Sequence, residues 1–527
     1  MVMKCAGAVA LTLALCGGTV IAHTDDDSFE HQHHVRHVLL ISVDGLHALD
    51  LSNYVATHKD STLAALTAHG VTFTNNSSST PSDSFPGLAA LVTGGSPTTT
   101  GFWYDDTYNR VLSPPAMTDG LGNPGGSCPG TVGTAVNLDE AIDIDLTRLD
   151  GGGGLNPSFL VRDPKHGCRT VMPHDYLRVN TIFEVVRAHG GITAWTDKHP
   201  SYEWTNGPSG KGVTDFYGPE INSIPVALPQ VQSCAAVPFP DTAADDGWTT
   251  SFDNIKCYDS IHVRAVLNQI DGYNHDRSRR IGVPTVFGTN FQAVSVGQKL
   301  ASDPVTGAKG GYLDGQGTPG AALAGELDFV DQSLGQFVSE LKKEGLYDST
   351  AIIVSAKHGQ SPIDITKRQG IGGGQPAATI GSAEAFDLSD DGSLIWLTDS
   401  KLTSAVVANL STPQNQQALG IQEIFAGASL RNKFNDPAVD PRTPDIILKV
   451  NTGVIFTKGH KLAEHGGLNE DDVHTALLVC LPGEEAASVS LPTTNQQVAA
   501  SVLDLLGIDP RELQAVRKEQ IHSLPLP

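Results

Sequence analysis

The strongest constraint on the fold is a pair of short segments near the start of the chain, residues 37–46 and 80–94. The first is an apolar run that ends on Asp44, which is typical of a buried strand. The second places Ser84 directly before an apolar stretch with a proline in its first turn, which predicts a helix N-terminus. A carboxylate at the carboxyl end of a strand and a hydroxyl at a helix N-terminus are suited to hold an anion or its metal ion.

Short apolar runs alternate with helical patterns along much of the chain. Strands are expected at 37–43, 71–74, 192–196, 284–296, 350–355, 445–450 and 474–480. Helices are expected near 61–69, 86–93, 179–188, 258–270, 320–343 and 495–506. This alternation predicts an α/β fold in which a central, mostly parallel sheet is sandwiched by helices.

Three stretches interrupt this alternation and are expected to be inserted loops or a cap: 105–175, 197–255 and 299–320. The first two have little periodicity, and the first is rich in glycine and proline. Loops of this length in a compact domain are often functional. No linker divides the chain cleanly, so we expect a single domain over residues 23–527 that carries these insertions.

Composition and charge limit the possible partners. The 527 residues are 39% hydrophobic and 17% charged, as in ordinary globular proteins. The formal net charge is −24 and no basic block occurs, so a nucleic-acid polymer is not an expected partner. Residues 1–22 combine Lys4, an apolar centre and a small-residue end, which predicts a cleaved signal peptide rather than a membrane anchor. The mature chain is then expected to be secreted, without a transmembrane anchor. Its oligomeric state is not indicated.

The cysteines agree with an oxidising compartment. Those beyond the predicted signal are Cys128, Cys168, Cys234, Cys257 and Cys480. Two disulfides and one free thiol are the simplest arrangement. Cys480 lies in an apolar run, so we expect it to be the unpaired, buried cysteine, while the pairing of the other four stays open. Asn75, Asn76 and Asn409 each begin a sequon, which is compatible with a glycoprotein.

Four residues at predicted strand ends and helix starts carry chemistry: Asp44, Ser84, His358 and His465. Ligands of parallel sheets bind beyond the carboxyl ends of the strands. An acid, a hydroxyl and two imidazoles placed there could form a metal site or a nucleophile with its helpers. Each residue alone also has a structural interpretation, such as a helix N-cap for Ser84. The joint pattern favours a catalytic site.

Four motifs follow one another in an order that resembles one known family. They are ISVDGL, SFPGLAALVTG, a His-Gly after a helix–strand unit, and HGG. With the closing run QVAASVLDLLGIDP, the chain resembles the type I phosphodiesterase/nucleotide pyrophosphatase family of the alkaline phosphatase superfamily over residues 35–110 and 280–510. The resemblance implies an alkaline phosphatase-like core with a two-zinc site. It also implies a Thr or Ser nucleophile that attacks phosphorus and forms a covalent intermediate.

Residue by residue, the resemblance carries over unevenly. It implies that Asp44 is the first metal-binding acid and that Ser84 is both the nucleophile and a metal ligand. His358 and His465 match imidazole ligands of the family. In the chemistry itself a serine hydroxyl can replace the threonine hydroxyl of many relatives, so Ser84 remains the expected nucleophile.

The chain departs from the family pattern at other positions. Gly87 stands where the family usually has an Asn that steadies a phosphate oxygen, and it is a candidate substrate contact together with Gln298. Val294 and Gln298 replace the acid and the imidazole of the Asp-x-x-Gly-His ligand motif. A competing placement of that motif at 314–318 keeps the acid but not the His. Lys357 replaces the acid of the family's Asp-His-Gly.

These departures bear on the metal that the resemblance implies, zinc or another divalent ion. Zinc needs about four ligands with net negative charge, and the remaining candidates are Asp44, Ser84, His358 and His465. A complete two-zinc centre is therefore not expected. The ammonium of Lys357 could instead stabilise developing negative charge, take the proton of Ser84, or only pair with Asp44 or face solvent. In the last case His358 or His465 remains as the general acid or base.

The sequence leaves three functions open, each with a small molecule as partner. The first is a secreted hydrolase of phosphate monoesters or diesters, resembling nucleotide pyrophosphatases/phosphodiesterases, with Ser84 as nucleophile. The second is a metal-poor or metal-free hydrolase of a carboxylic or sulfuric ester that uses a Ser84–Lys357 pair. The third is a degenerate relative that binds a phosphorylated or glycan ligand without turnover. The retained Ser84 favours an enzyme.

Overall fold

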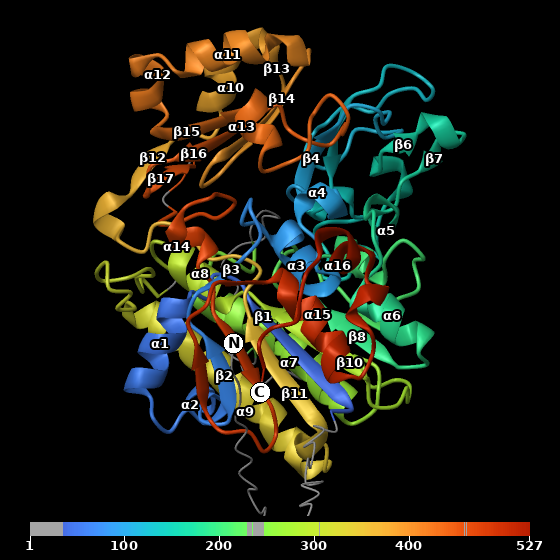
Figure 1. The fold of residues 1–527 in the computed structure, drawn as a ribbon, viewed down its shortest axis with the longest axis vertical. Helices are drawn as coiled ribbons and strands as arrows, with labels where there is room; N and C mark the ends of the chain where they lie inside the picture. The colour runs from blue at the N-terminus through green and yellow to red at the C-terminus, as the bar shows by residue number, and fades with distance from the viewer. Residues whose placement is uncertain are drawn as a thin grey trace, which may run out of the picture. The chain divides into compact units, whose positions relative to one another are not determined.

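The largest element of the fold is an eight-stranded sheet with the strand order β19-β2-β18-β11-β1-β10-β8-β9 (Figure 1). It is seen in a computed structural model that describes residues 35–228, 234, 247–304, 306–457, 459 and 461–526. The strands are β1 His37–Val43, β2 Gly70–Phe73, β8 Thr193–Thr196, β9 Asp215–Tyr217, β10 Val286–Phe291, β11 Thr350–Ser355, β18 Leu477–Cys480 and β19 Ala487–Val489. β1 runs parallel to β10 and β11, whereas β18 runs antiparallel to β11 and β2. The expected central, mostly parallel sheet is confirmed.

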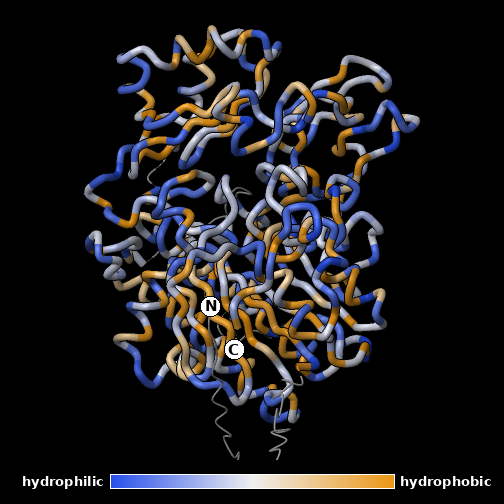
Figure 2. The backbone as a smooth tube through the Cα atoms, viewed as in Figure 1, coloured by the Kyte–Doolittle hydropathy of each residue, from blue (hydrophilic) through white to orange (hydrophobic). Residues whose placement is uncertain are grey.

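Both faces of this sheet are covered by helices, because successive side chains of a strand point to opposite faces. Val38 and Leu40 of β1 belong to one hydrophobic cluster, and Leu39 and Ile41 belong to another. The first cluster includes α3 Ser84–Thr93, α6 Ile182–Ala188 and α15 Gln496–Leu505, and the second includes α2 Thr62–Thr67, α7 Phe252–Ile270 and α9 Ala321–Lys343. Figure 2 shows hydrophobic residues concentrated along the strands of this sheet.

One predicted strand is shorter than expected. The apolar run 284–296 forms β10 only as far as Phe291, and a helix, α8 Ala293–Lys299, begins two residues later. The buried carboxylate of Asp259 accepts the backbone N–H groups of Gln292 and Ala293, each at 2.8 Å. These N–H groups lie at the start of α8, where no carbonyl of the helix can accept them. A contact from distant Asp259 therefore ends the strand.

A second sheet was not expected as a separate unit. Its four strands, all paired antiparallel, are β13 Glu384–Ser389, β14 Ser393–Leu397, β16 Ile446–Val450 and β15 Ile421–Ala426. It is called the cap sheet here, and the helices α10 Gln375–Ile380, α11 Thr403–Leu410, α12 Pro413–Ala418 and α13 Gly427–Arg431 accompany it (Figure 1). The predicted strand 445–450 therefore exists, but it belongs to the cap sheet rather than the central sheet.

Within the predicted insertion 105–175, the structure has small elements instead of core strands. β4 Asp106–Asn109 and β5 Thr134–Asn137 form a two-stranded antiparallel hairpin. Among the described cysteines there are two disulfides, Cys128–Cys168 and Cys234–Cys257, and Cys480 is buried and unpaired, as expected.

Three further expectations concern a glycosylation site, a membrane anchor and the signal peptide. Asn76 is buried and donates its side-chain amide to Thr475 and Asn495, so its sequon is not accessible to a glycan. In the part of the chain that the structure describes, no helix has the length and hydrophobicity to cross a membrane. The predicted signal peptide, residues 1–22, lies outside the described residues.

Candidate active site

The four residues that the sequence singled out converge at the carboxyl end of the central sheet. Asp44 follows β1, Ser84 is the first residue of α3, and His358 follows β11 in the next turn. Ser84 Oγ lies 3.3 Å from His358 Nε2, which lies 3.5 Å from Asp44 Oδ2. The ring of His465, from the loop before α14 Glu470–Val473, lies against the ring of His358 at an angle of 33°, with 3.8 Å between centroids. The expected grouping is thus found.

Ser84 is free for chemistry because another residue caps its helix. The side chain of Asp83 accepts the backbone N–H of Phe85 at 3.0 Å and is the N-cap of α3. Ser84 is therefore the first helical residue, and its hydroxyl is not used as the cap that the sequence allowed. At a helix N-terminus the macrodipole favours negative charge. This position favours the ionised form of the hydroxyl and any anion bound to it.

An ammonium group that the sequence analysis missed completes the contacts of Ser84. Lys198 Nζ lies 3.0 Å from Ser84 Oγ and 3.4 Å from Asp44 Oδ2. Burial disfavours the ammonium, but nearby carboxylates, Asp44 foremost, outweigh it and raise the pKa of Lys198 above its usual value. Lys198 therefore stays charged at neutral pH. It comes two residues after β8, so the rule that ligands bind beyond strand ends could have found it.

Lys357 does not make the contacts that were expected of it. Its ammonium is fully buried and donates to Asp197 Oδ1 at 2.7 Å, and it lies over the ring of Tyr202, 4.2 Å from the centroid. It therefore neither faces solvent nor forms the expected pair with Ser84, which Lys198 contacts instead. Burial lowers the pKa of Lys357, although the Asp197 carboxylate opposes that shift.

His358 is arranged as a base for Ser84. Its Nδ1 lies 2.8 Å from the carbonyl oxygen of Gly359, and because a carbonyl only accepts, Nδ1 carries the proton. The lone pair of Nε2 then faces the Ser84 hydroxyl. Burial lowers the pKa of His358 below its usual value, and the positive charge of Lys198 acts in the same direction, against Asp44. The imidazole is therefore neutral at neutral pH and able to take a proton.

Asp44 holds a negative charge at the centre of these groups. Its Oδ2 accepts the side-chain amide of Gln292 at 2.5 Å as well as the ammonium of Lys198. Burial alone would raise the pKa of Asp44, but the positive charges of Lys357 and Lys198, together with the contact with His358, hold it well below its usual range. An ionised Asp44 next to His358 stabilises the imidazolium that forms when His358 takes a proton.

The residues present do not fit the two-zinc centre that the family resemblance implies. Val294 is buried in the apolar core, and the side-chain amide of Gln298 donates to the carbonyl of Gly45 and the hydroxyl of Tyr312, each at 2.8 Å. Within the described ranges, the acids and imidazoles close enough to share one ion are Asp271, Glu340 and Glu344, none of them at this site. The cations that contact the carboxylates of the site are the ammonium groups of its two lysines.

The two candidate substrate contacts occupy structural positions. A Cβ on Gly87 would lie 2.1 Å from the carbonyl oxygen of Lys357, so only glycine allows α3 to approach that strand end so closely. Gln298 is held in the buried hydrogen-bond network described above. Neither residue is among those that line the neighbouring cavity. The structure thus gives a packing reason for the absence of the family's Asn at position 87.

A cavity of about 610 Å³ borders the site and reaches the cap sheet. Lys198, Gln292 and His465 line it on the side of the site, and Leu388 of β13 lines it on the side of the cap sheet. Its volume is in the range of small-molecule pockets. Ser84 itself is fully buried, so a substrate reaches its hydroxyl only when the side chains between it and the cavity move.

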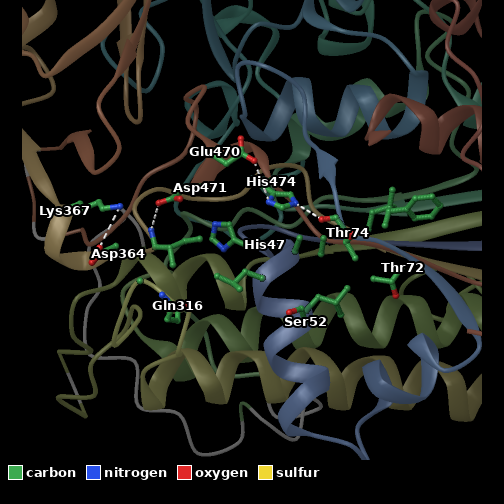
Figure 3. A pocket seen from close by; sticks show the side chains of 18 residues that line it. His47, Ser52, Thr72, Thr74, Gln316, Asp364, Lys367, Glu470, Asp471 and His474 are labelled. Carbon is green, nitrogen blue, oxygen red and sulfur yellow. Dashed lines mark hydrogen bonds and ion pairs between the residues drawn. The ribbon is translucent and has the colours of Figure 1, made fainter. Parts of the chain in front are cut away.

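A second cavity, of about 630 Å³, is separate from this site (Figure 3). His47, Asp364, Asp471 and His474 are among the residues that line it, and none of the converging site residues does. Its polar groups are engaged with the protein: Asp471 accepts the backbone N–H of residue 363, and His474 contacts the backbone carbonyl of Thr74 (Figure 3). The first cavity, by contrast, is lined by Lys198 and His465 of the converging site.

Comparisons with known proteins agree with the fold and the motifs. A family model described as type I phosphodiesterase / nucleotide pyrophosphatase matches residues 38–123 and 310–474. No curated protein matches the sequence significantly. Murine ectonucleotide pyrophosphatase / phosphodiesterase 5 superposes with a TM-score of 0.55 at 12% identity, covering 90% of this chain and 96% of that chain. The human protein of that name gives 0.53 at 14% identity, covering 90% and 95%.

A crystal structure of the alkaline phosphatase PafA has a TM-score of 0.56 at 12% identity, with 90% of this chain and 96% of that chain covered. At such identities the structural matches show a shared fold, while the family model matches the sequence itself. Its two matched segments contain Asp44, Ser84, His358 and His465. The chain thus resembles the type I phosphodiesterase/nucleotide pyrophosphatase family over these two segments, and it shares the fold of the ectonucleotide pyrophosphatase / phosphodiesterase and alkaline phosphatase structures.

Proposed function

We propose that the chain hydrolyses phosphate monoesters or diesters, with Ser84 as the nucleophile, and that it does so without the two-zinc centre. The observation that carries this proposal is the environment of Ser84 Oγ. A neutral imidazole lone pair lies 3.3 Å away on His358, and an ammonium lies 3.0 Å away on Lys198. A base that takes the proton and a cation that stabilises the resulting charge are what a serine nucleophile requires.

In the first step, Ser84 Oγ attacks phosphorus and its proton passes to His358 Nε2. The bond from phosphorus to the leaving oxygen breaks, and that oxygen takes a proton from solvent in the cavity. Lys198 and the N-terminus of α3 stabilise the negative charge on the phosphoryl oxygens. Asp44 stabilises the imidazolium of His358. The product is a phosphoserine intermediate and a free alcohol.

In the second step, water attacks the phosphoserine from the cavity and the bond from phosphorus to Ser84 Oγ breaks. The proton that His358 holds returns to Ser84 Oγ, and the attacking water loses its own proton to solvent. The site is then restored with phosphate or a phosphate monoester as product. Each protein group returns to the protonation state that its surroundings favour.

The comparisons support a small phosphate ester as substrate. The murine relative was also solved as an inactive variant in complex with AMP. The cavity beside Ser84, about 610 Å³, is large enough for a ligand of that size. Substrate identity within this class depends on the cavity walls from the cap sheet and from the loops.

We also propose that the chain is secreted. Disulfides persist in oxidising compartments, and the described part of the chain has two of them, Cys128–Cys168 and Cys234–Cys257. Expression in a secreting host, followed by N-terminal sequencing of protein from the medium, tests this. A mature terminus near residue 23 is expected, and full-length protein retained in the cells contradicts it.

Trapping of the intermediate tests the proposed reaction. Wild-type protein incubated with a ³²P-labelled ester and quenched in acid should carry label on the peptide that contains Ser84. The Ser84→Ala variant should carry none and lose turnover, whereas Ser333→Ala, a buried serine of α9, should behave as wild type. Label on another residue, or turnover that survives Ser84→Ala, contradicts the role of Ser84.

Two alternatives are each favoured by one observation. The serine–imidazole pair without metal ligands also suits carboxylic or sulfuric esters, since acyl hydrolases use such a pair. The complete burial of Ser84 favours a protein that binds its ligand without turnover. A panel of phosphate, sulfate and carboxylic esters, with and without added zinc, separates them. Turnover confined to non-phosphate esters supports the first alternative, and no turnover on any supports the second.

A further inference from the structure

Lys357 connects the turn after β11, which carries His358, to the turn after β8, which carries Lys198. Its backbone is next to His358 at the end of β11, and its ammonium contacts Asp197 and Tyr202, which lie on either side of Lys198 in the chain. β11 and β8 are not neighbours, because β1 and β10 lie between them in the sheet. The ion pair therefore spans the sheet end where Asp44 lies and joins the turn of the base to the turn of Lys198.

Asp197 contacts Lys198 as well as Lys357. Its Oδ1 accepts both the ammonium of Lys357 at 2.7 Å and the backbone N–H of Lys198 at 2.9 Å. Its Oδ2 accepts the indole N–H of Trp195 at 3.0 Å. The carboxylate is completely buried and all of these contacts are with groups that donate. Asp197 is thus held in one orientation, and the start of the Lys198 side chain is held with it.

The charge of Lys357 also prevents a competing contact. Asp197 attracts the ammonium of Lys198, as Asp44 does. With Lys357 in place, Asp197 is already neutralised, and the long side chain of Lys198 extends to Ser84 and Asp44. Without that charge, the buried carboxylate of Asp197 would be unpaired next to the backbone of Lys198. The ammonium of Lys198, which Asp197 already attracts, would then be available to neutralise it.

We propose that Lys357 is a positioning residue: by neutralising and orienting Asp197, it keeps the ammonium of Lys198 on Ser84 and Asp44. The contribution to catalysis rests on the proposed function, in which Lys198 stabilises negative charge. The placement of Lys198 does not depend on that function, so it is tested separately. Lys357 makes no hydrogen bond to Ser84, so its replacement acts chiefly through Lys198, with a further effect through the charge that it places near Asp44.

Crystal structures of wild type and Lys357→Met test the placement without reference to activity. In the variant we expect Lys198 Nζ to leave Ser84 Oγ and to bind Asp197. In Lys357→Met/Asp197→Asn, which has no unpaired buried carboxylate, Lys198 should return to Ser84. A Lys198 that stays on Ser84 in Lys357→Met overturns the proposal. If the single variant fails to fold, the double variant still tests the proposal, since a Lys198 displaced from Ser84 in the double variant contradicts the competition argument.

A kinetic double-mutant cycle tests the catalytic consequence. Lys198→Met should lower kcat by about 10²–10³, as the loss of one charge-stabilising donor does. Lys357→Met should lower kcat about 10², the effect of misplacing a catalytic group, while Lys357→Arg keeps the charge and should recover at least part of it. The double variant Lys198→Met/Lys357→Met should be little slower than Lys198→Met, because Lys357 acts chiefly through Lys198. Losses that add overturn the positioning role.

These two experiments separate the two proposals. A wild type without turnover on any ester contradicts the proposed function, while the crystal structures still decide whether Lys357 places Lys198. If Lys198→Met turns over as fast as wild type, the placement of Lys198 by Lys357 still stands, but Lys198 does not contribute to catalysis. KM should change less than kcat in Lys357→Met, because Lys198 acts on charge that develops during the reaction.

Discussion

Removing the ammonium of Lys357 should be among the most destabilising single changes in this chain. Lys357 and Asp197 have no exposed side-chain surface, and their charged atoms are 2.7 Å apart. At an effective dielectric constant of about 20, two unit charges at that distance attract by about 6 kcal/mol. The cost of taking both from water is of the same order, so the intact pair adds little net stability. Lys357→Met removes the attraction but leaves Asp197 buried, and a loss of about 3–5 kcal/mol is expected.

The pH dependence of that loss follows from the same contacts. Burial raises the pKa of Asp197, with the charge of Lys357 opposing this shift. Without Lys357 the pKa of Asp197 rises further, so its folded-state pKa lies above its unfolded value. Such a carboxyl favours folding at pH values below its unfolded pKa, and this contribution is lost as pH rises through the folded pKa. Lys357→Met should therefore lose more stability at pH 8 than at pH 5.

Equilibrium unfolding in guanidinium chloride, with reversibility checked by refolding, measures these losses. Lys343→Met is the control, because its ion pair with Glu340 leaves the lysine 64% exposed and is worth at most about 1 kcal/mol. The variant Lys357→Met/Asp197→Asn should be more stable than Lys357→Met at pH 8, since it buries no unpaired charge. A loss below about 1 kcal/mol for Lys357→Met at pH 8, or an equal loss in the double variant, would refute the reasoning.

Three further predictions concern His358, Gly87 and Asp472. The acid limb of kcat/KM should lie below pH 6.5, because burial and Lys198 lower the pKa of His358, and Lys198→Met should move that limb to higher pH in a pH–rate profile. Gly87→Ala should cost about 1–3 kcal/mol in chemical denaturation, since its Cβ would lie 2.1 Å from the Lys357 carbonyl oxygen; an unchanged midpoint contradicts this. Burial raises the pKa of Asp472 to about 8, so it stabilises the fold at low pH and this is lost as pH rises toward 8. Thermal midpoints between pH 5 and 8.5 should fall less in Asp472→Asn than in wild type.

Local patterns predicted the parts of the fold that local forces determine. The apolar run of β1 and the helix start at Ser84 were found because burial periodicity and helix-start signals are written in adjacent residues. The end of β10 was missed because Asp259, distant in the chain, begins the next helix there. The run 445–450 was correctly expected as a strand, but an apolar strand does not specify the sheet that it joins.

In the site, too, residues at the ends of recognisable elements could be predicted, whereas contacts between distant segments could not. Asp44, Ser84 and His358 could be predicted because each stands at the end of a recognisable element. Lys198 was missed because the turn after β8 lies at the start of a stretch taken for an insertion, and its contact with Ser84 depends on strand order in the sheet. The direction of the Lys357 side chain was equally hidden, since only the fold brings Asp197 within reach.

The charges around Ser84 form a consistent set without a metal ion. Asp44 and Asp197 supply two buried carboxylates, and Lys198 and Lys357 supply two ammonium groups that contact them. Relative to the family pattern, the acid-to-lysine change at position 357 shifts the local charge by two units, and Asp197 offsets part of that shift. A dication placed here would add two positive charges beside the two ammonium groups that already contact these carboxylates. The missing ligands and the lysine at position 357 are therefore linked through the electrostatics of the site.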